Sequence, residues 1–227
     1  MAQYFDAHCH IPDIATAERV ASLDVPVFAI NNSAKISDWE TVIDIANKFP
    51  NIMGTLGVHP WFCDNLMSGW DLLLQDLLRA NPRMTVGEIG LDKKHGNLDI
   101  QIPIFTRQLE LAIAFNRGVH IHCVGAFDVL LPILHAHRSA LPPFVLFHRF
   151  SGAPHDIERL ISDYNAYFSY RDTNGATRIL ATPPERILSE TDSANPSDVI
   201  AHTHALAALC QIPEHTLYEN AKRMLNL

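Results

Sequence analysis

Short apolar runs alternate along this chain with longer segments in which apolar positions recur at helical spacing. The short runs predict strands, because each is bounded by polar or turn-forming residues. Eight such strands are expected, over Tyr4–His8, Val25–Asn31, Ile52–Val58, Met84–Ile89, Val119–Cys123, Phe144–His148, Ala166–Tyr170 and Arg186–Glu190.

The longer segments predict helices. Ser37-Asp38-Trp39-Glu40 has the form of a capping box and predicts a helix that continues to Phe49. Phe105–Phe115 carries apolar side chains at helical spacing. Further helices are expected over Trp70–Leu78, Phe127–Leu134, Ile157–Ile161, Val199–Cys210 and Glu214–Leu227.

Strands that alternate with helices favour a parallel sheet. Eight such units in 227 residues predict a compact α/β chain, a (β/α)8 barrel of the TIM type that forms a single domain over residues 1–227. An open doubly wound sheet is the alternative, but the chain lacks a glycine-rich turn after the first strand, so dinucleotide binding has no support. In a barrel, the chemistry is expected where the strands end and the loops begin.

The composition of the chain mainly excludes some classes of function. The net charge of −8, with histidines neutral, argues against a broad basic face for duplex DNA. The first residues do not resemble a signal peptide, and no apolar stretch is long enough to span a bilayer. The four cysteines form no Cys-x-x-Cys pair, which is typical of reduced thiols. We therefore expect a cytoplasmic protein without a membrane partner and, since no coiled-coil segment is evident, a monomer.

The spacing His-x-His occurs four times in the chain. Side chains two residues apart share one face of a strand but not of a helix. Only His8/His10 and His120/His122 lie in or at the end of predicted strands, whereas the other two pairs lie in or at the end of predicted helices and are interpreted as surface or capping histidines. Taken alone, His8 and His10 are as consistent with two unrelated histidines as with a metal site.

Polar side chains collect at the predicted strand ends. In a barrel, four histidines and two carboxylates would converge at one mouth, namely His8, His10, Glu88, His122, His148 and Asp192. Each alone is more typical of a structural polar contact, but six together indicate a site. This mixed nitrogen and oxygen set favours Zn²⁺, Mn²⁺ or iron over an all-oxygen Mg²⁺ site.

Six motifs follow one another along the chain: Asp6-Ala7-His8-Cys9-His10, Gly57-Val58-His59-Pro60, Val86-Gly87-Glu88-Ile89-Gly90-Leu91-Asp92, Ile121-His122-Cys123, Phe147-His148-Arg149-Phe150-Ser151-Gly152 and Leu188-Ser189-Glu190-Thr191-Asp192-Ser193. In order and spacing they resemble the TatD family of metal-dependent deoxyribonucleases, within the amidohydrolase-like barrels. The resemblance covers nearly the whole chain.

This resemblance implies two divalent metal ions, Zn, Mn or Mg, with Glu88 bridging them. The other implied ligands of one ion are His8, His10 and Asp192. Those of the second ion are His122 and His148. It also implies that His59 contacts a substrate phosphate. The implied activity is two-metal hydrolysis of phosphodiester bonds in DNA, as a 3'-5' exodeoxyribonuclease.

Four places depart from the family pattern. Arg149 stands where cysteine is common, Val124 where arginine is frequent, and Ala194 where proline is usual. After the seventh strand, Arg171-Asp172 stands where a glycine or a small polar pair is usual. We hypothesise that Arg149 replaces the missing positive charge and binds substrate. Lys93, after the fourth strand, is a candidate to meet substrate phosphate, with a solvated loop lysine as the alternative.

Two metal ions about 3.5–4 Å apart can activate a water and relieve negative charge in the transition state. The predicted catalytic residues are Asp192, which accepts or orients the proton of that water, together with Glu88 and His59. Trp61 and Phe62 are candidates to stack a base, or else pack within their loop.

Asp6 and Glu190 each lie two residues before a predicted ligand and are candidates to orient it, or else form salt bridges inside the barrel. His120 is interpreted as a histidine of the barrel core.

Two other functions stay open. The same metal centre can act on a small phosphodiester, lactone or amide, which the altered substrate positions and the acidic balance support. Alternatively, the protein binds metal without catalysis, against which the large ligand set argues, because structural sites are normally closed and four-coordinate. The expected partners are accordingly DNA ends or a small phosphodiester.

Overall fold

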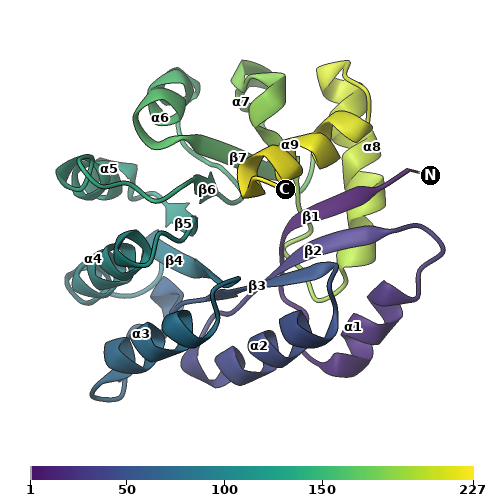
Figure 1. Cartoon of the computed structure of the whole chain (residues 1–227). Coiled ribbons are helices and arrows are strands. Elements are labelled where there is room, and N and C mark those ends of the chain that lie inside the picture. The colour runs from purple at the N-terminus through teal and green to yellow at the C-terminus, as the bar shows by residue number, and fades with distance from the viewer. Residues whose placement is uncertain (1) are drawn as a thin grey trace.

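The computed structural model describes residues 2–227, and its eight strands form one parallel sheet in the order β1 to β8 (Figure 1). A helix follows each strand, so the predicted (β/α)8 barrel is confirmed. The strands are β1 (Tyr4–Cys9), β2 (Val27–Asn32), β3 (Ile52–Leu56), β4 (Thr85–Asp92), β5 (Val119–Val124), β6 (Val145–Phe147), β7 (Ala166–Tyr170) and β8 (Ile187–Ser189).

The ends of the sheet meet through the segment that follows β8. The backbone N–H of Asp192 donates to the carbonyl of His8, and the N–H of His10 donates to the carbonyl of Ser193, both at 2.8 Å. These bonds nearly close the barrel, and they bring Asp192 beside the two histidines at the end of β1.

The helices surround the strands (Figure 1). They are α1 (Ile14–Ala21), α2 (Trp39–Lys48), α3 (Trp70–Ala80), α4 (Leu98–Ala114), α5 (Phe127–Ala136), α6 (Ile157–Tyr164), α7 (Ala176–Ala181), α8 (Val199–Cys210) and α9 (His215–Leu225). Helix α9 packs Ala221 and Met224 into an apolar cluster with Phe5 and Phe144, near the N-terminal ends of β1 and β6. That end is opposite to the strand ends at which chemistry is expected.

Several helix predictions were wrong in detail. Ser37 does not begin the second helix; α2 begins at Trp39, after a short 3-10 turn in which the Asp38 carboxylate accepts the N–H groups of Ala34 and Lys35. Helix α4 begins at Leu98, well before the predicted start.

Pro103 lies inside α4 and interrupts the pattern that the prediction used. Helices α1 and α7 were not predicted. Among residues 2–227, no helix combines the length and the apolar character needed to cross a bilayer.

Candidate metal centre

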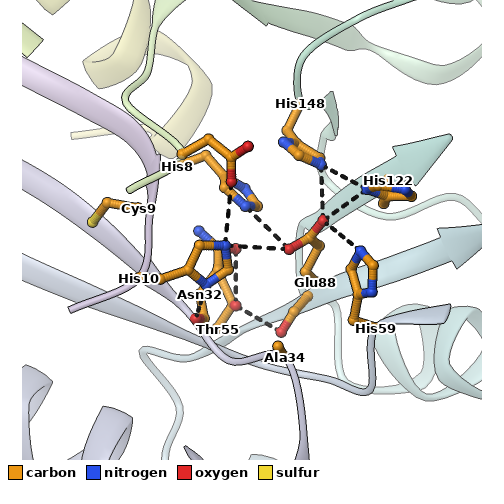
Figure 2. Close-up of polar contacts among 12 residues, drawn as sticks. His8, Cys9, His10, Asn32, Ala34, Thr55, His59, Glu88, His122 and His148 are labelled. Carbon is orange, nitrogen blue, oxygen red and sulfur yellow. Dashed lines mark hydrogen bonds and ion pairs between the residues drawn. The ribbon is translucent and has the colours of Figure 1, made fainter. Parts of the chain in front are cut away.

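The buried carboxylate of Glu88, on β4, is the centre of a cluster of imidazoles at the C-terminal ends of the strands (Figure 2). Both of its oxygens face ring nitrogens. The nitrogens near Oε1 are His148 Nε2 at 2.8 Å, His122 Nδ1 at 3.0 Å and His59 Nε2 at 3.2 Å, and those near Oε2 are His8 Nε2 at 3.3 Å and His10 Nε2 at 3.5 Å. One carboxylate therefore separates two groups of histidines.

Asp192 joins the group beside Oε2, since its Oδ1 lies 3.4 Å from His10 Nε2. Ligand atoms about 2.0–2.2 Å from a tetrahedral zinc ion lie about 3.3–3.6 Å from one another. The separations beside Oε2, at 3.3–3.5 Å, are of this size, whereas those beside Oε1, at 2.8–3.2 Å, are shorter and must widen slightly around an ion. Two His/Glu groups that can hold a metal ion share this carboxylate, one with His8 and His10 and the other with His59 and His122. The residues present thus fit a divalent metal.

The second nitrogen of each ring shows which histidines have a lone pair free for metal. His10 Nδ1 lies 2.9 Å from the carbonyl of Asn32, and His122 Nε2 lies 3.3 Å from Asp92 Oδ2. Both partners accept hydrogen bonds, so these nitrogens can carry the proton, and the opposite nitrogen, which faces Glu88, is then left with a lone pair for a metal ion. His10 and His122 are therefore oriented as metal ligands.

His59 has the opposite arrangement. Its Nδ1 accepts the backbone N–H of Trp61 at 3.1 Å, so in the neutral ring the proton is on Nε2. That Nε2 points to Glu88 Oε1 as a hydrogen-bond donor. Consequently, His59 is better suited to donate to an anionic oxygen than to bind a cation.

The charges of Glu88 and His8 agree with metal binding, whereas attraction to Glu88 outweighs burial and raises the pKa of His148 to about 9, so a metal ion would have to displace that proton. Burial alone would raise the pKa of Glu88, but the imidazoles of His148, His59 and His8 outweigh burial and hold that pKa well below its usual range. Burial, together with the neighbouring His148, lowers the pKa of His8 to about 3. Glu88 is thus ionised and His8 neutral at pH 7, the states that metal ligation requires.

Asp92 is a residue of the site to which the sequence assigned no role. Its Oδ2 lies 3.3 Å from His122 Nε2 and accepts the indole N–H of Trp61 at 2.7 Å. A carboxylate behind a metal-binding imidazole fixes its ring orientation. The available signal was spacing, because Asp92 follows Glu88 by an even number of residues along a strand.

Asp6 and Glu190 support the backbone more than the imidazole rings. Asp6 accepts the N–H of His8 at 3.1 Å and both the N–H and the hydroxyl of Thr191, so it ties β1 to the segment after β8. Glu190 accepts the N–H of Arg149 at 2.9 Å, and its Oε2 lies 3.8 Å from His148 Nδ1. Burial raises the pKa of Glu190 to about 7.

His120 is fully buried, as a core histidine should be, and its ring nitrogens have no hydrogen-bond partner within residues 2–227. The two His-x-His pairs in helices, at the end of α5 and in α8, lie outside the metal-binding groups of the described residues.

The site opens into a cavity of about 840 Å³. Arg149 lies at this cavity, and its Nη1 donates to Asp192 Oδ2 at 3.0 Å. Both residues have a left-handed backbone, with φ of 41° and 49°. Lys93 is placed elsewhere, with its Nζ 2.6 Å from Asp128, and the lysine that lines the cavity is Lys94.

A (β/α)8 barrel with a cluster of imidazoles and carboxylates at its mouth defines the class of metal-dependent hydrolases. The family described as "TatD related DNase" matches residues 5–223. The chain belongs to the TatD family.

Similar proteins agree with this assignment. The human "3'-5' RNA nuclease TATDN2" is 29% identical over 203 residues, which are 81% of this chain and 25% of that protein. The "3'-5' ssDNA/RNA exonuclease TatD" of Escherichia fergusonii is 26% identical over 120 residues, which are 52% of this chain and 46% of that protein. The chain thus spans less than half the length of these two curated relatives.

The fold has a close counterpart among solved structures. The crystal structure of the TatD homologue YJJV from Escherichia coli K12 superposes with a TM-score of 0.84 and covers 99% of this chain and 98% of its own, at 23% identity. At this level of identity the likeness concerns the fold.

Proposed function

We propose that this protein is a two-metal nuclease that removes nucleotides from the 3' end of DNA. The observation that carries the proposal is the position of Glu88, whose two carboxylate oxygens face separate groups of imidazoles at the floor of an open cavity. The names of the nuclease relatives support a nucleic-acid substrate.

In this proposal Glu88 would help to hold two divalent ions, Zn, Mn or Mg. Beside Oε2, the other ligands would be His8, His10 and Asp192. Beside Oε1, they would be His122 and His148. When bound, the ions supply an acidified water and neutralise charge on the phosphate. His59 is kept out of the ligand set because its donating nitrogen faces the cluster.

Three side chains of the protein have separate roles in the proposed reaction. Asp192 accepts or orients the proton of the attacking water, since Oδ1 faces the cluster while Oδ2 is held by Arg149. His59 donates from Nε2 to an oxygen of the bound phosphate. The Arg149 side chain, which is 53% exposed, adds positive charge at the rim of the cavity and contacts the same phosphate.

The test is digestion of an end-labelled single-stranded DNA oligonucleotide with Mn²⁺ or Mg²⁺. We expect shortening in single-nucleotide steps from the 3' end, abolished by chelator and by Glu88→Ala. A 5'-blocked and a 3'-blocked substrate establish the direction, and an RNA oligonucleotide of the same sequence measures the preference for sugar. A wild-type protein shown to hold two metal ions that shortens neither oligonucleotide would refute the nuclease proposal.

The departures at Arg149 and Val124 favour a second candidate, hydrolysis of a small phosphodiester, lactone or amide by the same centre, because both lie at the cavity. Bis(p-nitrophenyl) phosphate and a panel of lactones distinguish this candidate from the first. Turnover of a small substrate without cleavage of oligonucleotides would support it. Stoichiometric metal binding without any hydrolysis would instead support a non-catalytic metal-binding protein.

A further inference from the structure

Trp61 presents a half-exposed indole to the cavity, and the indole is held in one orientation. The residue lies in a 3-10 turn after β3 and is 49% exposed. Its ring N–H donates to Asp92 Oδ2 at 2.7 Å, and its backbone N–H donates to His59 Nδ1. A rigid aromatic surface of this kind binds a flat ligand with little loss of side-chain entropy.

His95 already shows how a flat ring fits on that surface. Its imidazole stacks on the indole, with ring centroids 4.5 Å apart and planes 29° from parallel. His95 is exposed in the loop after β4, and in the part of the chain that the structure describes no hydrogen bond engages its ring. The imidazole therefore covers an aromatic face without being fixed there, and another ring can stack beside it or replace it.

The Trp61 indole lies close to the candidate metal centre. The Trp61 ring centroid lies 6.3 Å from that of His122 and 5.0 Å from that of His59, and all three residues line one cavity. A ring bound on Trp61 would thus lie next to two imidazoles of the candidate metal centre. The protein has 25 acidic and 17 basic residues. It is therefore poorly suited to hold a nucleic-acid strand through attraction to the phosphates alone.

We propose that Trp61, with His95 as its adaptable neighbour, forms a stacking subsite for an unpaired nucleobase next to the scissile phosphate. This inference rests on the proposed function, which supplies the phosphate at Glu88. Base stacking on an aromatic side chain tolerates every base. It also requires that the base has left its own stack. The substrate class is therefore a single strand, or a frayed end, without preference for sequence.

A double-mutant type of cycle, in which both the substrate and the protein are changed, tests the subsite. The substrates are an end-labelled DNA oligonucleotide and two versions with a tetrahydrofuran abasic nucleotide at the last or the penultimate 3' position. For the wild type, we expect one abasic version to lower kcat/KM about tenfold. Trp61→Ala should lose about tenfold on the intact strand and nothing further on that abasic version, because the interaction is already absent.

Phe62→Ala is the matched control. Phe62 is the adjacent aromatic residue and is 41% exposed, but it lies outside the cavity lining and packs edge-on near His59, with ring centroids 6.3 Å apart. Whatever its absolute rate, this variant should keep the wild-type ratio of kcat/KM between the intact and the abasic strands. Trp61→Phe should recover most of the intact-strand rate. The metal affinity of Trp61→Ala must equal that of the wild type, which separates stacking from an effect relayed through Asp92.

A binding measurement separates failure of the subsite from failure of the nuclease. Two oligonucleotides, with 2-aminopurine at the last or at the penultimate 3' position, are each titrated with protein in chelator, where cleavage is absent. Stacking quenches the fluorescence of 2-aminopurine, and Trp61→Ala should remove the quenching while Phe62→Ala retains it. If the wild type cleaves DNA but Trp61→Ala still discriminates against the abasic strand tenfold, the subsite is refuted and the nuclease stands. If quenching depends on Trp61 but no strand is cleaved, the subsite stands and the nuclease does not.

Discussion

At the residue scale, Asp92 links the candidate metal centre to the exposed indole of Trp61. One carboxylate oxygen meets both the imidazole of His122 and the indole of Trp61. Its pKa is lowered, because hydrogen bonds from Trp61 and from the backbone of Lys94 outweigh the effect of burial. An ionised carboxylate at this position makes His122 a more basic ligand and keeps its ring in place.

We expect Asp92→Asn to weaken metal binding by about 10–100-fold while leaving the fold intact, since a neutral amide loses the charge behind His122. Competition with a chromophoric chelator measures the affinity. Asp128→Asn is the control, because Asp128 pairs with Lys93 on the surface and lies outside the cavity lining. Equal affinities for the two variants would show that Asp92 does not act through the metal ligand.

At the element scale, β4 carries both Glu88 and Asp92, and its pairing with β5 depends on Gly90. This glycine has a φ of +151°, and a Cβ there would lie 1.8 Å from the carbonyl oxygen of His122 on β5. Only a residue without a side chain allows β4 and β5 to pair while Glu88 and His122 face each other.

Gly90→Ala should therefore destabilise the protein by about 3 kcal/mol or more, as expected for a backbone clash in the core. Gly69→Ala is the matched control, because Gly69 also has a positive φ, of 78°, but nothing lies within 4 Å of its added Cβ. That variant should cost only about 1–2 kcal/mol. Urea unfolding measures the free energy of unfolding of both variants. Similar losses of stability would contradict the conclusion that a side chain at position 90 clashes with β5.

Periodicity predicted the strands well because a barrel strand is buried on both sides and forms an unbroken apolar run. The bounds of β7 were predicted as observed, and the other seven strands differ at their ends. Helix α7 was missed because it has six residues and follows a glycine, which gives no amphipathic pattern to detect.

The convergence of Glu88 with five histidines was open to prediction, because strand ends of a barrel share one mouth. The partners of Asp92 and the turn of Lys93 toward Asp128 depend on loop conformation, which residue spacing does not encode.

At the scale of the whole molecule, the metal centre joins β1, β4, β5, β6 and the segment after β8. A ligand that binds only the folded state stabilises it by mass action, by about 2.7 kcal/mol at 100 times its Kd. Because about 2–4 °C in Tm corresponds to each kcal/mol in a chain of this size, metal should raise Tm by about 5–10 °C.

The measurement is thermal unfolding of chelator-treated protein with and without added Zn²⁺ or Mn²⁺. Glu88→Ala should show a much smaller metal-induced rise in Tm, since two of the three groups that can hold a metal lose their shared carboxylate and only that of His8, His148 and Glu190 keeps all its ligands. An equal metal-induced rise in this variant would place the metal outside the cluster.

The charge of the whole molecule limits how it holds a nucleic acid. The chain has a net charge of −8, and the basic side chains at the cavity are Lys94 and Arg149. Two phosphate contacts to a single strand give a slope of log Kobs against log salt of about −1.4. We expect this shallow slope for the oligonucleotide bound in chelator. Lys94→Ala should reduce its magnitude by about 0.7, whereas Lys93→Ala, which removes only the partner of Asp128, should leave it unchanged. A slope steeper than about −4 would require a basic track along the strand, and affinity would then come from the backbone and not from stacking on Trp61.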